Sequence, residues 1–311
     1  MKHLLSCAAV AALLALGLVV VAPPATAVSA GLADHTGPPA MSAPVDRTDR
    51  AAMQTMQIPS HGALMNALVY VAAGAGPHPA VVLLHGFPGN ERNLDLAQDI
   101  RRAGWDVLYF NYRGSWGTPG DFSFAHSIED TAAAVDYLRQ PEVAKSLRLD
   151  PSRIVLIGHS MGGFMAIAAT AADPRIKAFA TISAADMAGR AQAVVRKEGE
   201  AAGLAAIAKG LADEGMAPLS GCTPDGLAHE LLEHAADWRF LSKVDALKDR
   251  TALVVTSDDG LAPANETLTA ALHQAGDSHV TSLHLPTDHS YSDQRQELSR
   301  AVLAWLAALP K

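Results

Sequence analysis

A serine set between glycines is the feature of this sequence that most directly suggests chemistry. Gly158-His159-Ser160-Met161-Gly162 follows an apolar run and precedes a run of small residues. A buried strand would therefore lead into this turn, and a helix would lead out of it. In so tight a turn, the positions two before and two after the serine have no room for side chains, which accounts for Gly158 and Gly162. The sequence predicts that Ser160 stands exposed at the end of a strand, where it could act as a nucleophile.

A serine hydroxyl is a weak nucleophile near neutral pH, so Ser160 would need a general base, and the base would need an acid to orient it. Six histidines follow it in the chain: His229, His234, His273, His279, His284 and His289. Only His289 falls in a loop between the last expected strand and the last expected helix. We therefore expect His289 to be the base, and the other five to be surface or packing residues.

The acid is expected in the loop after the strand at 251–256, where Asp258 and Asp259 are adjacent. Asp259 is the preferred candidate because it lies four residues before a proline that would start the next helix. Asp258 would then be a solvated carboxylate. Asp288 is next to His289, but we interpret it as structural, because side chains adjacent in a loop usually point in different directions.

Two backbone N–H groups would have to stabilise the oxyanion that forms during attack on a carbonyl. Met161 directly follows the nucleophile and is the first candidate. The second lies in the loop His85-Gly86-Phe87-Pro88, which follows an early apolar run. Phe87 is the candidate there, because Pro88 has no N–H to donate.

Strands and helices alternate along most of the chain. Strands are expected at 63–71, 80–84, 105–110, 153–157, 176–182, 251–256 and 280–285, and helices at 94–103, 127–139, 161–172, 263–275 and 294–309. This order predicts an α/β fold whose mostly parallel central sheet is flanked by helices. The helix at 127–139 is expected to start with Ser127 as its N-cap and Asp130 in a loose capping box.

The alternation is interrupted at about 186–247, where the sequence is Ala-rich and helical with Gly and Pro breaks. We interpret this segment as a helical cap inserted after one strand, near the edge of the sheet where such folds bind ligands. An elaborate crossover is the alternative. Five large side chains could shape a pocket or could equally pack in the core or cap: Trp116, Phe122, Phe124, Met187 and Trp238.

Several motifs together resemble those of the α/β-hydrolase superfamily, and most closely its bacterial esterase-like and prolyl-oligopeptidase-like serine hydrolases. They are His85-Gly86-Phe87-Pro88-Gly89, Asn111-Tyr112-Arg113-Gly114, Gly158-His159-Ser160-Met161-Gly162-Gly163 and Asp288-His289. The resemblance covers roughly residues 58–309. It implies an eight-stranded core, the chain order Ser160, Asp259, His289 for a catalytic triad, and oxyanion donors at Phe87 and Met161. Thr256-Ser257 departs from the glycine often found at the start of the acid loop, which bears on the choice between the two aspartates.

The activity that this resemblance implies is cleavage of carboxylic ester bonds in small substrates through an acyl-enzyme. A serine peptidase or aminopeptidase is one alternative, and Glu198 with Glu200, or Glu230 with Glu233, could then bind a substrate amine. An acyltransferase, in which an alcohol replaces water, is another. A non-catalytic binding protein is disfavoured, because such relatives usually lack a triad member.

The first residues have the pattern of a secretory signal peptide. Lys2 precedes an apolar run at 4–22, and Ala25-Thr26-Ala27 offers a cleavage site. We therefore expect a signal peptide at 1–27, a flexible linker at 28–50 and an α/β-hydrolase domain at 51–311, in a periplasmic or secreted protein. An uncleaved membrane anchor is the alternative. Cleavage would remove Cys7 and leave Cys222, which we interpret as a packing residue.

Charge and composition limit the partners. The net charge is −8 and no Lys/Arg-rich run is present, which argues against a nucleic-acid partner. No metal-binding motif stands out, and no cofactor or metal is expected. The expected partner is a small-molecule acyl substrate, with no stable membrane partner unless the signal peptide stays uncleaved. The sequence leaves the oligomeric state open.

Overall fold

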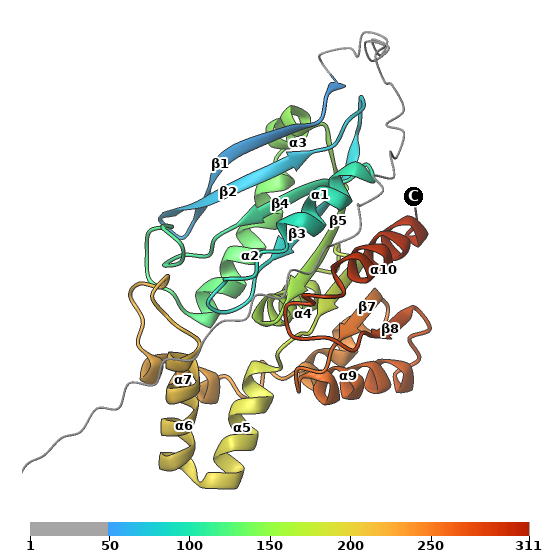
Figure 1. The fold of residues 1–311 in the computed structure, drawn as a ribbon. Helices are drawn as coiled ribbons and strands as arrows, with labels where there is room; N and C mark the ends of the chain where they lie inside the picture. The colour runs from blue at the N-terminus through green and yellow to red at the C-terminus, as the bar shows by residue number, and fades with distance from the viewer. Residues whose placement is uncertain (1–48, 311) are drawn as a thin grey trace, which may run out of the picture. The chain divides into compact units, whose positions relative to one another are not determined.

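The structure is a computed structural model that describes residues 49–310 (Figure 1). The predicted signal peptide at 1–27 lies outside the described residues, as does the predicted linker apart from its last two residues. Within the described range, no helix combines the length and the apolar character needed to cross a bilayer.

An eight-stranded sheet occupies the centre of the described chain, in the order β1-β2-β4-β3-β5-β6-β7-β8. The strands are β1 Ala52–Ser60, β2 Ala63–Val71, β3 His78–Leu84, β4 Asp106–Phe110, β5 Leu149–His159, β6 Ala178–Ile182, β7 Thr251–Thr256 and β8 Val280–His284. β2 runs antiparallel to both β1 and β4, and the other neighbouring pairs are parallel. This confirms the predicted α/β fold with a mostly parallel sheet.

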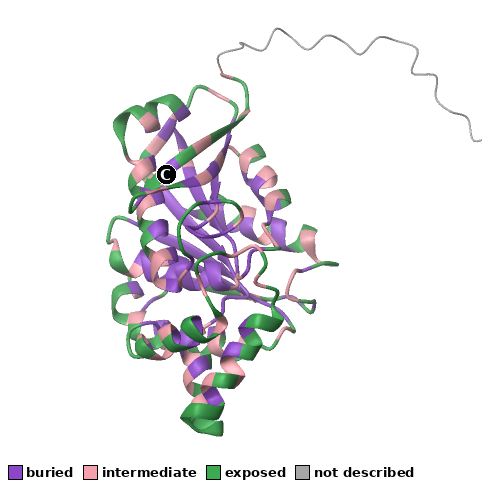
Figure 2. Ribbon diagram, turned by 90° about the vertical axis from the view of Figure 1, so that its left-hand side faces the viewer, coloured by how far each residue is buried: buried purple, intermediate pink, exposed green. Residues whose placement is uncertain are grey.

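Helices cover both faces of the sheet, as Figure 1 shows. They are α1 Leu94–Arg102, α2 Phe124–Leu138, α3 Pro141–Leu147, α4 Met161–Ala172, α9 Ala262–Gln274 and α10 Arg295–Ala308. Side chains of α1 and α10 share one apolar cluster with Val81 and Ile157, while α2, α3, α4 and α9 share the other with Val82 and Leu156. Successive side chains of a strand point to opposite faces, so the central parts of β3 and β5, at 80–84 and 154–157, need apolar residues at every position. Figure 2 shows this buried central layer.

The segment between β6 and β7 is helical and stands at one end of the sheet (Figure 1). It contains α5 Met187–Glu198, α6 Glu200–Asp213, α7 Pro224–Glu233, η2 Phe240–Lys243 and α8 Val244–Leu247. We call these elements and the turns between them the cap. The cap is joined to the loop after β4 by a bridge between Ser115 and Leu219 and by a 2.9 Å bond from the Trp116 N–H to the Pro218 carbonyl.

The start of α2 differs from the expectation. The helix begins at Phe124 with Ser123 as its N-cap, so Ser127 lies inside it and donates from its hydroxyl to the Ser123 carbonyl. The expected capping box at Ser127 is therefore wrong. The reason is tertiary: Glu230 of the cap accepts hydrogen bonds from the first backbone N–H groups of the helix, at Phe124 and Ala125.

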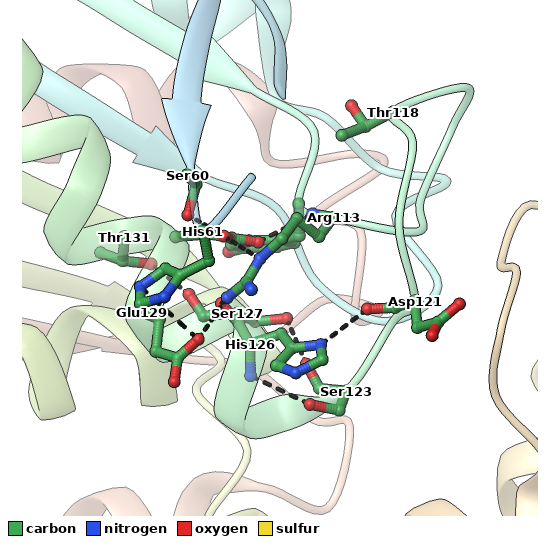
Figure 3. Close-up of polar contacts among 12 residues, drawn as sticks. Ser60, His61, Arg113, Thr118, Asp121, Ser123, His126, Ser127, Glu129 and Thr131 are labelled. Atoms are coloured by element: carbon green, nitrogen blue, oxygen red, sulfur yellow. Dashed lines mark hydrogen bonds and ion pairs between the residues drawn. The ribbon is translucent and has the colours of Figure 1, made fainter. Parts of the chain in front are cut away.

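Asp130 instead anchors a buried ion pair with Arg113. Figure 3 shows Arg113 close to Ser60 and Glu129. The Asp130 carboxylate is fully buried and accepts from Arg113 Nε at 2.6 Å, from the Arg113 backbone N–H at 2.7 Å and from Ser60 Oγ at 2.6 Å. Glu129 also pairs with the guanidinium of Arg113, and this bond holds the pKa of Glu129 below its usual value. These contacts fix the start of the loop that carries Trp116.

Candidate active site

Ser160 lies in a strained turn between β5 and α4. Its backbone has φ 57° and ψ −121°, a conformation that side-chain-bearing residues rarely adopt. A Cβ at Gly158 would collide with the Gly162 backbone, and one at Gly162 would collide with the Leu84 carbonyl. The expectation that both positions must lack side chains is confirmed, and the turn places Ser160 at the N-terminus of α4.

Hydrogen bonds to the next strand hold this turn. The Ser160 N–H donates to the Ile182 carbonyl at 2.9 Å, and the Ser160 carbonyl accepts from Gly163 and Ala185 at 3.0 Å each. Both Ile182 and Ala185 belong to the end of β6 and the residues that follow it. The backbone of Ser160 is therefore fixed on both sides, while its half-buried side chain reaches a pocket.

Asp259 and His289 form a close pair beside Ser160 in the same pocket. His289 Nδ1 donates to Asp259 Oδ2 at 2.7 Å, and the Asp259 side chain is only 5% exposed. Burial alone would raise the pKa of this carboxyl. Hydrogen bonds from His289, the Leu261 N–H and Ser183 outweigh burial and hold the pKa of Asp259 well below its usual range. Asp259 therefore stays ionised and sets the proton of His289 on Nδ1.

Asp258 and Asp288, the other two aspartates that the sequence placed near the candidate acid and base, have other partners. Asp258 lies 3.1 Å from His284 Nε2, and both side chains are well exposed. Asp288 accepts from the backbone N–H and the hydroxyl of Ser292, at 2.9 and 2.7 Å. The structure thus brings Asp259 to His289 and turns the other two carboxylates elsewhere.

His159 is a contact that the sequence reasoning did not identify. Its Nε2 donates to the His289 carbonyl at 2.8 Å, and the two rings lie with centroids 4.6 Å apart. Burial, with a smaller contribution from the charge of His289, lowers the pKa of His159 to about 3. His159 is therefore neutral at ordinary pH and acts as a fixed donor that holds the loop of His289. The sequence signal that could have indicated this contact was the position of His159 directly before Ser160.

A buried group of hydroxyls supports Asp259 from behind. Ser183 Oγ lies 3.0 Å from Ser257 Oγ and 2.9 Å from the Tyr291 hydroxyl, and Ser183 also hydrogen-bonds Asp259. Tyr291 is completely buried, and burial raises its pKa to about 12. These three residues are distant in sequence, so no local pattern indicated that they would meet.

The loop that contains Phe87 lies directly against Ser160. A Cβ at Gly86 would be 2.8 Å from Ser160 Cβ and 3.4 Å from Ser160 Oγ. Phe87 and Met161 both line the pocket beside Ser160. Trp116 braces this loop, since its Nε1 donates to the Pro88 carbonyl at 2.7 Å. The guanidinium carbon of Arg92 lies over the Trp116 ring, 4.1 Å from the ring centroid.

The pocket has a volume of about 540 Å³ and lies between the sheet edge and the cap. Of the five large side chains considered from sequence, Met187 lines it. Phe122 and Phe124 are buried and pack against Phe87, and Trp238 packs against Phe164. The other cap residues of the lining are mostly small or aliphatic, and in an Ala-rich segment they carried no distinctive signal.

The other polar residues that the sequence offered for substrate binding lie outside this pocket. Glu198, Glu200, Glu230 and Glu233 do not line this pocket, and Glu230 is occupied at the start of α2. Within residues 49–310, no group of three or more His, Cys, Asp and Glu side chains is arranged to hold a metal ion. Cys222 is half-buried and packs against the apolar core.

Comparisons with known proteins agree with this architecture. A family model described as alpha/beta hydrolase fold matches residues 79–205, which confirms the resemblance to the α/β-hydrolase superfamily. An esterase structure from Pyrococcus furiosus superposes with a TM-score of 0.58 at 16% identity, covering 84% of this chain and 91% of that chain. At such identity the likeness concerns the fold.

Two curated relatives match parts of the chain. An uncharacterized 31.7 kDa protein of Escherichia coli is 34% identical over 113 residues, which are 34% of this chain and 37% of that protein. The quorum-quenching protein AidA of Acinetobacter baumannii is 30% identical over 129 residues, 40% of this chain and 41% of that protein. The matches thus span well under half the length of these relatives.

Proposed function

We propose that this protein, which has the α/β-hydrolase fold, is a serine hydrolase that cleaves carboxylic ester bonds of small substrates. One observation carries the proposal. Ser160, His289 and Asp259 line a single pocket, with His289 bonded to a buried Asp259 at 2.7 Å. A nucleophile, a base and an orienting acid are the groups that acyl transfer requires.

In the first step, His289 Nε2 takes the proton of Ser160 as Oγ attacks the ester carbonyl carbon. The N–H groups of Met161 and Phe87 donate to the oxyanion, and one such donor is typically worth about 3 kcal/mol in the transition state. His289 then gives its proton to the leaving alcohol oxygen as the ester C–O bond breaks. The acyl group remains on Ser160 as an ester.

In the second step, His289 takes a proton from water while the water oxygen attacks the acyl-enzyme carbonyl. The proton passes to Ser160 Oγ as the acyl bond breaks, and the carboxylic acid leaves. Asp259 stays ionised throughout and stabilises the imidazolium, which its depressed pKa supports. His159 and the Tyr291–Ser183 hydroxyls keep the imidazole and Asp259 in place.

The likeness of the fold to an esterase structure is consistent with this proposal. The position of Glu230 at the start of α2 removes one of the acidic pairs considered for an aminopeptidase. Ester turnover should therefore exceed aminoacyl-amide turnover on the same acyl group. Adding an alcohol acceptor separates hydrolysis from acyl transfer, because transfer would yield a new ester in place of free acid.

The test is labelling with a fluorophosphonate, combined with turnover of p-nitrophenyl acetate. We expect one label per chain, on Ser160. Ser160→Ala should lose most of the hydrolysis rate and keep a small residual rate that comes from the oxyanion donors and substrate binding. A folded protein that takes no label at Ser160 and turns over no short ester would overturn the proposal.

We also propose that the chain is exported, because its first residues combine Lys2, an apolar run at 4–22 and a small-residue cleavage site at Ala25-Thr26-Ala27. N-terminal sequencing of protein from the periplasm or medium should begin at Val28. Recovery of the full-length chain in the membrane fraction would instead indicate an anchor.

A further inference from the structure

Two helices of the cap turn aliphatic stripes toward the candidate active site. On α5 the stripe consists of Met187, Ala191 and Val194, which recur at helical spacing. On α6 it includes Ile207 and Leu211. These residues line the same pocket as Ser160 and His289. Figure 1 shows that the two helices lie side by side in opposite directions. The pocket beside Ser160 is therefore walled on the cap side by one face of each helix, and we call this part of the pocket the cap groove.

The length of the cap groove can be read from α5. Met187 and Val194 are seven residues apart, which corresponds to about 10 Å along a helix axis. An extended carbon chain advances about 1.2 Å per bond, judged from the dimensions of an extended backbone. The cap groove thus matches an aliphatic chain of about eight bonds.

The chemistry of the walls favours a hydrocarbon chain over a polar one. Arg190 and Glu214 are the charged residues that the cap contributes to the lining, and both are exposed. They therefore lie at the solvated rim. A sugar, peptide or second carboxylate inside the cap groove would lose its hydrogen bonds to water and would meet aliphatic side chains.

We propose that the substrate is an ester of a linear, medium-chain carboxylic acid of about eight carbons, whose acyl chain lies in the cap groove. This inference rests on the proposed function. Gly210 of α6 is exposed and lies at the open side of the cap groove. It lines the pocket, and a Cβ added there would meet no heavy atom within 4 Å. A larger side chain at this position extends into the free space without displacing its neighbours.

The test uses p-nitrophenyl esters of two, four, eight and twelve carbons. With the wild type, kcat/KM should rise by about fourfold per added methylene up to about eight carbons and then level off. Gly210→Leu should lower kcat/KM for the eight-carbon ester at least tenfold more than it lowers kcat/KM for the two-carbon ester. Leucine is a better helix former than glycine, so the variant should be at least as stable as the wild type.

Ala205→Leu is the matched control, because Ala205 is an exposed residue of α6 that does not line the pocket. It should leave the chain-length profile unchanged. The proposal is overturned if the wild type turns over the two-carbon ester faster than the eight-carbon ester, or if Gly210→Leu slows both equally. Labelling of Ser160 is independent of chain length, so this failure would leave the proposed function standing, while absence of labelling would remove both.

Discussion

The two adjacent aspartates offer a sharp test of the site, because each pairs with a histidine but in different surroundings. Asp259 is buried and bonded to His289 at 2.7 Å, whereas Asp258 and His284 are exposed and 3.1 Å apart. We predict that Asp259→Asn abolishes most of the activity and that Asp258→Asn leaves it within about threefold. Exposed pairs contribute about 0.2–1 kcal/mol, which sets the smaller effect.

The size of the larger effect follows from the contacts of Asp259. Its Oδ1 accepts from the Leu261 N–H at 2.9 Å and its Oδ2 accepts from His289. In Asp259→Asn the amide carbonyl must face the Leu261 donor, so the amide NH₂ faces His289 Nδ1. That contact forces the imidazole proton onto the nitrogen that should accept from Ser160. A wrong tautomer of this kind costs about 10⁴-fold in the serine protease that served as the reference case.

The assay is kcat/KM for p-nitrophenyl acetate and for the wild type's best ester, together with the rate of fluorophosphonate labelling. Thermal unfolding of both variants checks that each is folded. We expect a loss of about 10³- to 10⁴-fold in Asp259→Asn. The reasoning is refuted if Asp259→Asn keeps more than a tenth of the wild-type rate, or if a folded Asp258→Asn loses as much as Asp259→Asn.

Three further predictions concern the supports of the site. Trp116→Phe removes the donor to the Pro88 carbonyl, in the loop of Phe87, but keeps an aromatic ring. It should lower kcat about tenfold with KM within twofold, and an equal change in KM, measured by steady-state kinetics, would argue against positioning. Asp130→Ala leaves Glu129, which is more exposed, as the remaining acidic partner of the buried Arg113 charge, and should lower the free energy of unfolding in urea by about 3 kcal/mol. No shift in the urea midpoint would contradict a stabilising buried pair. Because the pKa of Asp259 is lower in the folded than in the unfolded chain, its ionised carboxylate stabilises the fold above pH about 4, and this stabilisation is lost as the pH falls. Asp259→Asn lacks this carboxylate, so its melting temperature should decline less between pH 5 and 3 than that of the wild type.

Sequence patterns identified the part of the architecture that depends on local order. The strand at 251–256 and the helix at 161–172 have the bounds that were expected, because apolar runs and small residues mark them directly. The turn of Ser160 was equally readable, since a strained backbone restricts the neighbouring positions to glycine. Asp259 and His289 followed from the order of strands and loops, and the structure brings their side chains together.

Contacts between distant segments were not readable in the same way. The start of α2 was misplaced because Glu230, more than a hundred residues later, satisfies its first N–H groups. Tyr291 and Ser183 are buried together behind Asp259 although nothing local distinguishes either residue. The cap groove was missed for a related reason: its walls are ordinary aliphatic residues, and only the pairing of α5 with α6 brings them to one pocket.

Trp116 touches both the loop of Phe87 and the cap, and this double attachment has a thermodynamic consequence. Its ring Nε1 donates a hydrogen bond to the Pro88 carbonyl, and its backbone N–H donates one to the Pro218 carbonyl. Any shift of the cap at Pro218 changes the free energy of the conformation that presents Phe87, and the converse holds to the same extent. A displacement of the cap and the conformation of the Phe87 loop are thus linked equilibria in which Trp116 takes part.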